Sequence, residues 1–177
     1  MNRVVGMVAV VMIVVASVCG QQAEKKAEAE KPIRALSWLV GGVWVADASN
    51  LAPGMQKIET RYQWADNNAY IRFNTHFIFD KGTTKTYDGN FFWNPAQKSL
   101  AMWYMDVENT IVEGPVEVHG EVIRTTFRAQ DFDGKMADMQ VLVTRRNNDD
   151  YGWSLQERQG ETWRHLAALE YVRSARG

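Results

Sequence analysis

The stretch Trp38-Leu39-Val40-Gly41-Gly42-Val43-Trp44 decides how this sequence folds. It stands just before a long region in which short β-prone runs alternate with turn residues. Gly42 lets the backbone enter the first strand tightly. The indole of Trp44, two residues further on, is expected to plug one end of a barrel. We therefore predict an all-β chain whose first strand carries the plug.

Alternating apolar and polar residues predict the strands. The pattern is clearest over 56–64, where Ile58, Thr60, Tyr62 and Trp64 share one face. Because no helical segment separates the strands, we predict an antiparallel up-and-down β-barrel of about ten strands. A β-sandwich is the alternative architecture. The expected strands are 42–47, 56–64, 70–79, 84–93, 99–106, 110–119, 121–128, 136–146, 152–158 and 162–173.

The N-terminal region divides into three parts. Residues 1–20 resemble a signal peptide, with Arg3 before an apolar run that is short for a membrane span. Residues 21–32 are rich in Ala, Glu and Lys and form a flexible tether. The barrel domain, 33–177, begins with a short helix over 33–39 that covers one end of the barrel. Ile33, Leu36 and Leu39 or Val40 share one apolar face of this helix. We expect export to the periplasm or the extracellular space.

Cys19 is the only cysteine. Cleavage after Gly20 would leave a mature chain without cysteine and without a disulfide. The alternative is that Cys19 is lipidated and tethers the protein to a membrane. The formal net charge is −1, and the basic pair Arg145-Arg146 runs directly into Asn147-Asn148-Asp149-Asp150. No basic block is present, so the sequence does not support binding to nucleic acid.

Aromatic residues and methionine are abundant: seven Trp, seven Phe, six Tyr and eight Met. One interpretation is that they fill a core; the other is that they line a cavity for a small hydrophobic or amphipathic molecule. Alternation selects the following residues as lining or plugging the cavity: Trp44, Tyr62, Trp64, Phe73, Phe77, Trp93, Met102, Trp103 and Trp153.

Two strands, 70–79 and 84–93, carry large side chains on both faces. Phe73 and Phe77 alternate with Tyr70 and Ile78, for example. A barrel wall that faces water is usually more polar on one side. The N-terminal helix or a second subunit is therefore expected to cover part of this wall, and a homodimer is one hypothesis.

Motifs for chemistry are weak. The three histidines, His76, His119 and His165, lack a second ligand at close spacing, so no metal site is predicted. No nucleophile elbow and no phosphate-binding glycine loop is present. An enzyme acting on an apolar substrate in the cavity stays an alternative. It would need a polar group with a shifted pKa inside the barrel.

The residues from 36 to 44 resemble the opening of bacterial lipocalin-like domains of unknown function. Tyr87-Asp88-Gly89-Asn90-Phe91-Phe92-Trp93-Asn94-Pro95 is similar to a second segment of that family. The resemblance covers roughly 36–173 and implies a ligand-binding barrel. A related barrel family, nitrobindin, binds haem through a late-strand histidine, and the stretch around His165 is similar in position. That likeness implies haem as a cofactor held by His165, although Ala46 stands where nitrobindin has a second glycine.

These observations favour an exported barrel that binds a small hydrophobic or amphipathic molecule without catalysis. The alternatives are an enzyme that uses the same cavity, an envelope interaction domain with a filled barrel, and a haem protein.

Overall fold

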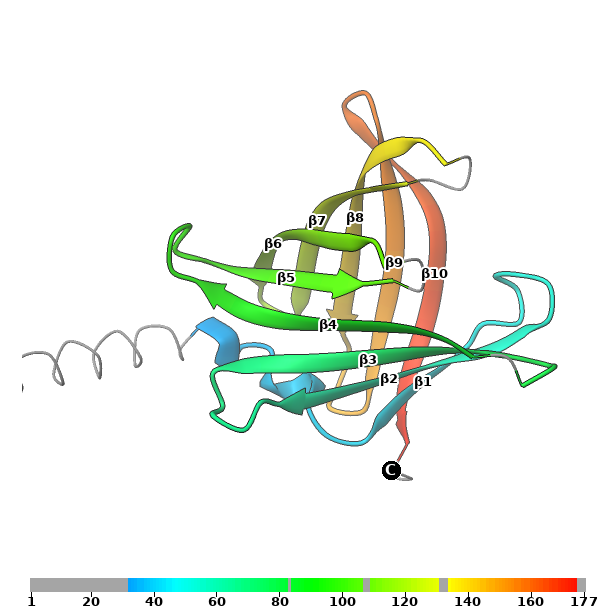
Figure 1. Ribbon diagram of the computed structural model, residues 1–177, viewed down its shortest axis with the longest axis horizontal. Helices are drawn as coiled ribbons and strands as arrows, with labels where there is room; N and C mark the ends of the chain where they lie inside the picture. Colours follow the sequence, from blue (N-terminus) through cyan, green and yellow to red (C-terminus); the bar gives the residue numbers. More distant parts are fainter. Residues whose placement is uncertain (1–31, 83, 107–108, 131–133, 175–177) are drawn as a thin grey trace, which may run out of the picture.

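The computed structural model describes residues 32–82, 84–106, 109–130 and 134–174. Ten antiparallel strands form a closed barrel in which β1 pairs with both β2 and β10 (Figure 1). This confirms the predicted barrel over the sandwich. The predicted signal peptide and residues 21–31 of the tether lie outside the described residues. The strands are β1 Val43–Asp47, β2 Met55–Trp64, β3 Tyr70–Phe79, β4 Thr84–Asn94, β5 Ser99–Met105, β6 Ile111–His119, β7 Val122–Gln130, β8 Met136–Arg145, β9 Asp150–Gln159 and β10 Thr162–Ser174.

The expected N-terminal helix is a helical turn at 32–34 followed by the 3₁₀ helix η1 (Ser37–Leu39). Ile33, Leu36 and Leu39 are 0%, 0% and 1% exposed, so the apolar face predicted from their spacing is buried. The segment lies at the end of the barrel where β3 begins (blue in Figure 1). It covers that end and contributes to the core.

Strand register decides which side chains face the lumen. Tyr62 lies opposite Phe73, and Phe73 lies opposite Gly89, so these positions share the inner face. Gly89 is needed there, because a Cβ would approach the Phe73 ring to 2.4 Å. The alternation predicted for β2 therefore has the correct phase, with Ile58 and Thr60 buried inside.

The barrel wall changes direction between β6 and β7. Their ladder covers only Val116–His119 and Val122–Thr125, although both strands are longer. Pro115 has no N–H to donate, which ends the ladder. A Cβ on Gly114 would overlap the carbonyl oxygen of Thr126, so only glycine allows the two strands to cross this closely.

One predicted lining residue lies on the wrong face for that role. Trp103 pairs with Asn90 and Glu113, whereas its neighbour Met102 pairs with Phe91 and is buried in the core. Adjacent residues on a strand point to opposite faces. Trp103 is therefore on the outer face of the barrel. The prediction that both Met102 and Trp103 line the cavity was wrong for Trp103, because two adjacent strand residues cannot both face inward.

Candidate ligand site in the barrel lumen

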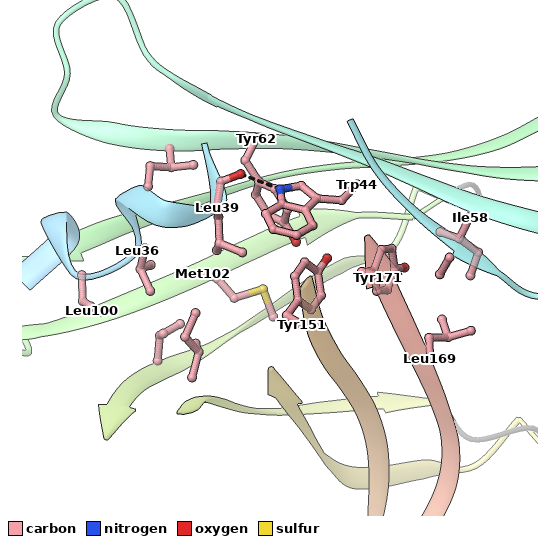
Figure 2. Close-up of a cluster of buried hydrophobic side chains, with 14 of the residues drawn as sticks. Leu36, Leu39, Trp44, Ile58, Tyr62, Leu100, Met102, Tyr151, Leu169 and Tyr171 are labelled. Atoms are coloured by element: carbon pink, nitrogen blue, oxygen red, sulfur yellow. Dashed lines mark hydrogen bonds between the residues drawn. The ribbon is translucent and has the colours of Figure 1, made fainter. Parts of the chain in front are cut away.

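One end of the lumen is closed by residues of the stretch 38–44, Trp44 above all. Trp44 is 0% exposed, and its indole N–H donates a hydrogen bond of 2.7 Å to the Leu39 carbonyl. Figure 2 shows Trp44 between the helical segment, with Leu36 and Leu39, and the rings of Tyr62 and Tyr151. The ring of Tyr151 lies 4.7 Å from that of Trp44. We call this the sealed half of the lumen.

Arg173 lies opposite Trp44 in the strand register and fastens the end of the sealed half. Its guanidinium lies 4.2 Å above the Trp44 ring and donates to the backbone carbonyls of Trp38 and Val40, at 2.6 and 3.1 Å. It also donates to the Gly41 carbonyl and pairs with Asp149 at 3.0 Å. A planar guanidinium presents several donors in a fixed geometry, which suits this cluster of carbonyl groups.

Buried tyrosine hydroxyls form a polar floor at the middle of the lumen. Tyr62 and Tyr151 are hydrogen-bonded to each other, and Tyr171 is hydrogen-bonded to Thr60. The Thr60 hydroxyl in turn lies 3.0 Å from that of Thr75. Burial raises the pKa of Tyr62 to about 12 and raises the pKa values of Tyr151 and Tyr171 as well. The floor therefore stays neutral, and it offers hydroxyl groups rather than charge.

Beyond the floor, aromatic rings from several strands line one wall. Phe77 and Tyr87 lie 4.8 Å apart, and Tyr87 stacks on Tyr104 at 5.4 Å with an interplanar angle of 12°. Phe127 continues the row, 6.3 Å from Tyr104. Burial is the main cause that raises the pKa of Tyr104, followed by the neighbouring Tyr87. This aromatic wall offers flat apolar surface with phenol groups at intervals.

The opposite wall is aliphatic. Val141, Leu155 and Ala167 lie side by side on β8, β9 and β10. Further along the same inner face, Glu157 lies opposite Arg164, whose guanidinium donates to the Glu157 carboxylate. The Glu157 side chain is 12% exposed and that of Arg164 is 54% exposed. The pair therefore places charge at the end of the lumen away from Trp44.

Inner-face side chains in the second half of the lumen are less completely buried than those around Trp44. Inner-face side chains in the sealed half, such as Leu36, Trp44 and Tyr151, have almost no accessible surface. By contrast, Phe77, Tyr87, Tyr104, Val141 and Leu155 are only half-buried although they face inward. We call the region that these five residues and Glu157 line the hollow half.

The structure divides the other predicted site residues between the two halves. Trp44, Tyr62 and Met102 are buried in the sealed half. Trp64, Phe73, Phe77, Trp93 and Trp153 keep partial exposure and pack against the core cluster. All the residues predicted to line or plug the cavity lie on the inner face, except Trp103. The sequence did not distinguish a plug from a lining.

Several residues of the site were missed. Tyr151 and Glu157 share the inner face of β9 with Trp153, at intervals of two residues. Thr60 precedes Tyr62 by the same interval, and Tyr104 follows Met102. The period of two that selected Trp153 and Met102 would also have selected these positions.

His165 lies on the outer side of β10. It is exposed and lies opposite Gln156, whose side chain bonds Gln140 on the outer face. The histidine expected to hold haem therefore does not face the lumen. Among the described residues, no three His, Cys, Asp or Glu side chains are grouped so that they could hold a metal ion. In the same part of the chain, no helix is long and apolar enough to cross a membrane.

Comparison with known proteins supports the fold. No protein-family model and no curated protein matches this chain. Among solved structures, the crystal structure of Rv2717c from M. tuberculosis superposes with a TM-score of 0.53 at 15% sequence identity. The match covers 81% of this chain and 97% of Rv2717c. At this identity the likeness concerns the fold alone, and it agrees with the closed antiparallel barrel described above.

Proposed function

We propose that this protein is an exported binding barrel that holds a small hydrophobic or amphipathic molecule in the hollow half of its lumen. The observation that supports the proposal is the contrast in exposure along the inner face. Side chains around Trp44 are sealed, whereas Phe77, Tyr87, Val141 and Leu155 face inward and keep accessible surface. Protein cores are normally close-packed, so apolar surface left accessible inside a barrel suits a ligand.

The two walls suggest the shape of that ligand. A flat or unsaturated apolar body would lie between the aromatic row of Phe77, Tyr87 and Tyr104 and the aliphatic wall with Ala167. A polar group would lie either at the hydroxyl floor or beside the Glu157–Arg164 pair. A fully apolar ligand would leave both polar groups without new partners.

Two adjacent alanines provide a matched test. Ala167 faces the lumen opposite Leu155, whereas Ala168 is exposed and lies opposite Ser154. The full chain would be titrated with palmitate and with an anilinonaphthalene sulfonate dye, by calorimetry and fluorescence. We expect Ala167→Trp, which fills the hollow half, to abolish binding, and Ala168→Trp to leave it unchanged.

Equal binding by Ala167→Trp and the parent protein would overturn the proposal, as would absence of binding by the parent. A thermal unfolding curve for each variant shows whether the barrel is intact. If Ala167→Trp does not fold, Leu155→Phe is the smaller lumen-filling change, and its binding decides the question.

Export is part of this proposal because the signal-like N-terminus, 1–20, supports it. Anchoring through a lipidated Cys19 and a homodimer through the outer wall of β3 and β4 stay predictions. Mass determination of the protein from its own cells tests the first, since lipidation adds a defined mass to Cys19. Elution over a range of concentrations tests the second.

A further inference from the structure

A second concave site lies on the outer surface, where β6 diverges from β7. The groove has a volume of about 400 Å³, within the range of about 300–1,000 Å³ typical of small-molecule sites. Its polar and aromatic lining includes Glu113, Pro115, Arg128, Asp138, Arg158 and Trp163. Phe127 and Met139, which strand register places on the inner face, form its apolar base. Strand register places Asp138 opposite Arg128 and Arg158 opposite Trp163. The charged residues and Trp163 therefore lie on the outer face of β7, β8, β9 and β10, above the apolar base.

Trp163 gives the groove a flat apolar flank. It is 38% exposed, and among the described residues it is one of five large hydrophobic side chains that are exposed. Apolar surface of an indole that stays in contact with water is unfavourable, and a bound molecule that covers it would remove this cost. The ring therefore offers a platform for a ligand with an apolar face.

The remaining lining can both donate and accept hydrogen bonds. Arg128 pairs with Asp138 at 3.3 Å, and Arg158 donates from Nε to the Gly160 carbonyl at 3.1 Å. Glu113 is exposed on the opposite side. Two guanidinium groups and two carboxylates give the groove no net charge.

We propose that this groove binds a neutral saccharide. A sugar ring has one face of C–H groups, which packs on an indole, and a rim of hydroxyl groups that both donate and accept. The indole of Trp163 and the mixed rim of Arg128, Asp138, Arg158 and Glu113 match those two features. The balanced charge does not favour a polyanion, and the charged lining does not favour a lipid tail.

The test is an NMR titration of the full-length protein with glucose, N-acetylglucosamine and short β-1,4-linked oligomers of each. The indole N–H signal of Trp163 is assigned by its loss in Trp163→Phe. We expect saccharide to shift this signal and to leave that of the buried Trp44 in place. We expect Trp163→Ala to weaken binding about tenfold or more, and Arg158→Ala to weaken it too.

Matched controls lie outside the groove on the same surface. Arg124, which pairs with Glu117, is the control for Arg158, and Val172, 55% exposed on β10, is the control for Trp163. Arg124→Ala and Val172→Ala are expected to bind saccharide like the parent. Ala167→Trp should also bind it, which separates this site from the lumen.

Three results would overturn the inference: no saccharide shifts the Trp163 signal, the affinity survives in both Trp163→Ala and Arg158→Ala, or only anionic polysaccharides bind. Because Arg158→Ala removes an exposed side chain, it keeps the test decisive even if Trp163→Ala unfolds.

Discussion

The two halves of the lumen are built from similar residues and differ in how completely these residues are packed. In the sealed half, Trp44 and Leu36 are 0% exposed, and Arg173 ties the β10 end to backbone carbonyls more than 130 residues earlier. In the hollow half, Phe77 and Tyr104 also face inward but keep accessible surface. The sealed half is therefore expected to contribute more to stability, and the less completely packed half could hold a ligand.

The largest effect is expected at the plug. Trp44→Ala should lower the free energy of unfolding by about 3–5 kcal/mol, because it opens a cavity that the closed end cannot refill. Urea denaturation measures this loss. Val172→Ala, at a position 55% exposed on β10, is the control and should change the value by no more than about 0.5 kcal/mol. Equal losses for the two variants would contradict the contrast between the plug and the surface.

The next effect concerns Arg173. Arg173→Met keeps the aliphatic stem but removes the donors to the Trp38 and Val40 carbonyls, so we expect a loss of about 2–3 kcal/mol. Arg173→Lys should recover little of it, because one ammonium cannot reproduce the planar fork. Arg146→Met is the control, since its side chain is 47% exposed and its ion pairs are superficial. If Arg146→Met lowered the free energy of unfolding as much as Arg173→Met, the loss would reflect ion pairing in general and not the contacts of Arg173 with the sealed half.

A smaller effect is expected in the hollow half. Phe77→Ala should lower the free energy of unfolding by about 1–2 kcal/mol, less than about 2–5 kcal/mol for Leu36→Ala. Part of the Phe77 surface is accessible already, so less burial is lost. Thermal unfolding of the two variants gives the comparison. A greater loss for Phe77→Ala would show that the second half is packed as tightly as the first.

The smallest effect appears only at high pH. Burial raises the pKa of Tyr62 to about 12, above its usual value of 10.0, so the folded state holds the phenol proton more tightly than the unfolded state. The stabilisation is therefore complete below pH 10 and is lost as pH rises towards 12. At pH 11 the loss from Tyr62 alone is about 1 kcal/mol. Urea midpoints measured between pH 8 and pH 11 should fall less steeply in Tyr62→Phe; identical slopes would contradict the buried hydroxyl floor.

The sequence predicted the features that depend on local pattern, namely which strand residues face inward and which face of the helical segment is buried. Alternation placed Thr60, Tyr62 and Phe73 inside, and the spacing of Ile33, Leu36 and Leu39 predicted the buried face of the helical segment. These signals need only a period of two or of 3.6 residues.

The sequence could not predict what depends on contacts between distant strands. The face of Trp103 is decided by its register with Asn90 and Glu113, and alternation within β5 alone leaves that choice open. Arg173 meets Trp38 and Val40 only because β10 closes the barrel against β1. Which half of the lumen is hollow depends on the packing of all ten strands and has no local signal.

Native mass spectrometry of the protein purified from its own cells, with an absorbance spectrum of the same sample, tests the central claim most directly. We expect a retained small molecule on the parent protein and on Ala168→Trp, and the bare mass for Ala167→Trp. A Soret band would identify the retained molecule as haem. Bare mass for the parent, with no uptake from a panel of lipids and porphyrins, would contradict the claim that the hollow half holds a ligand.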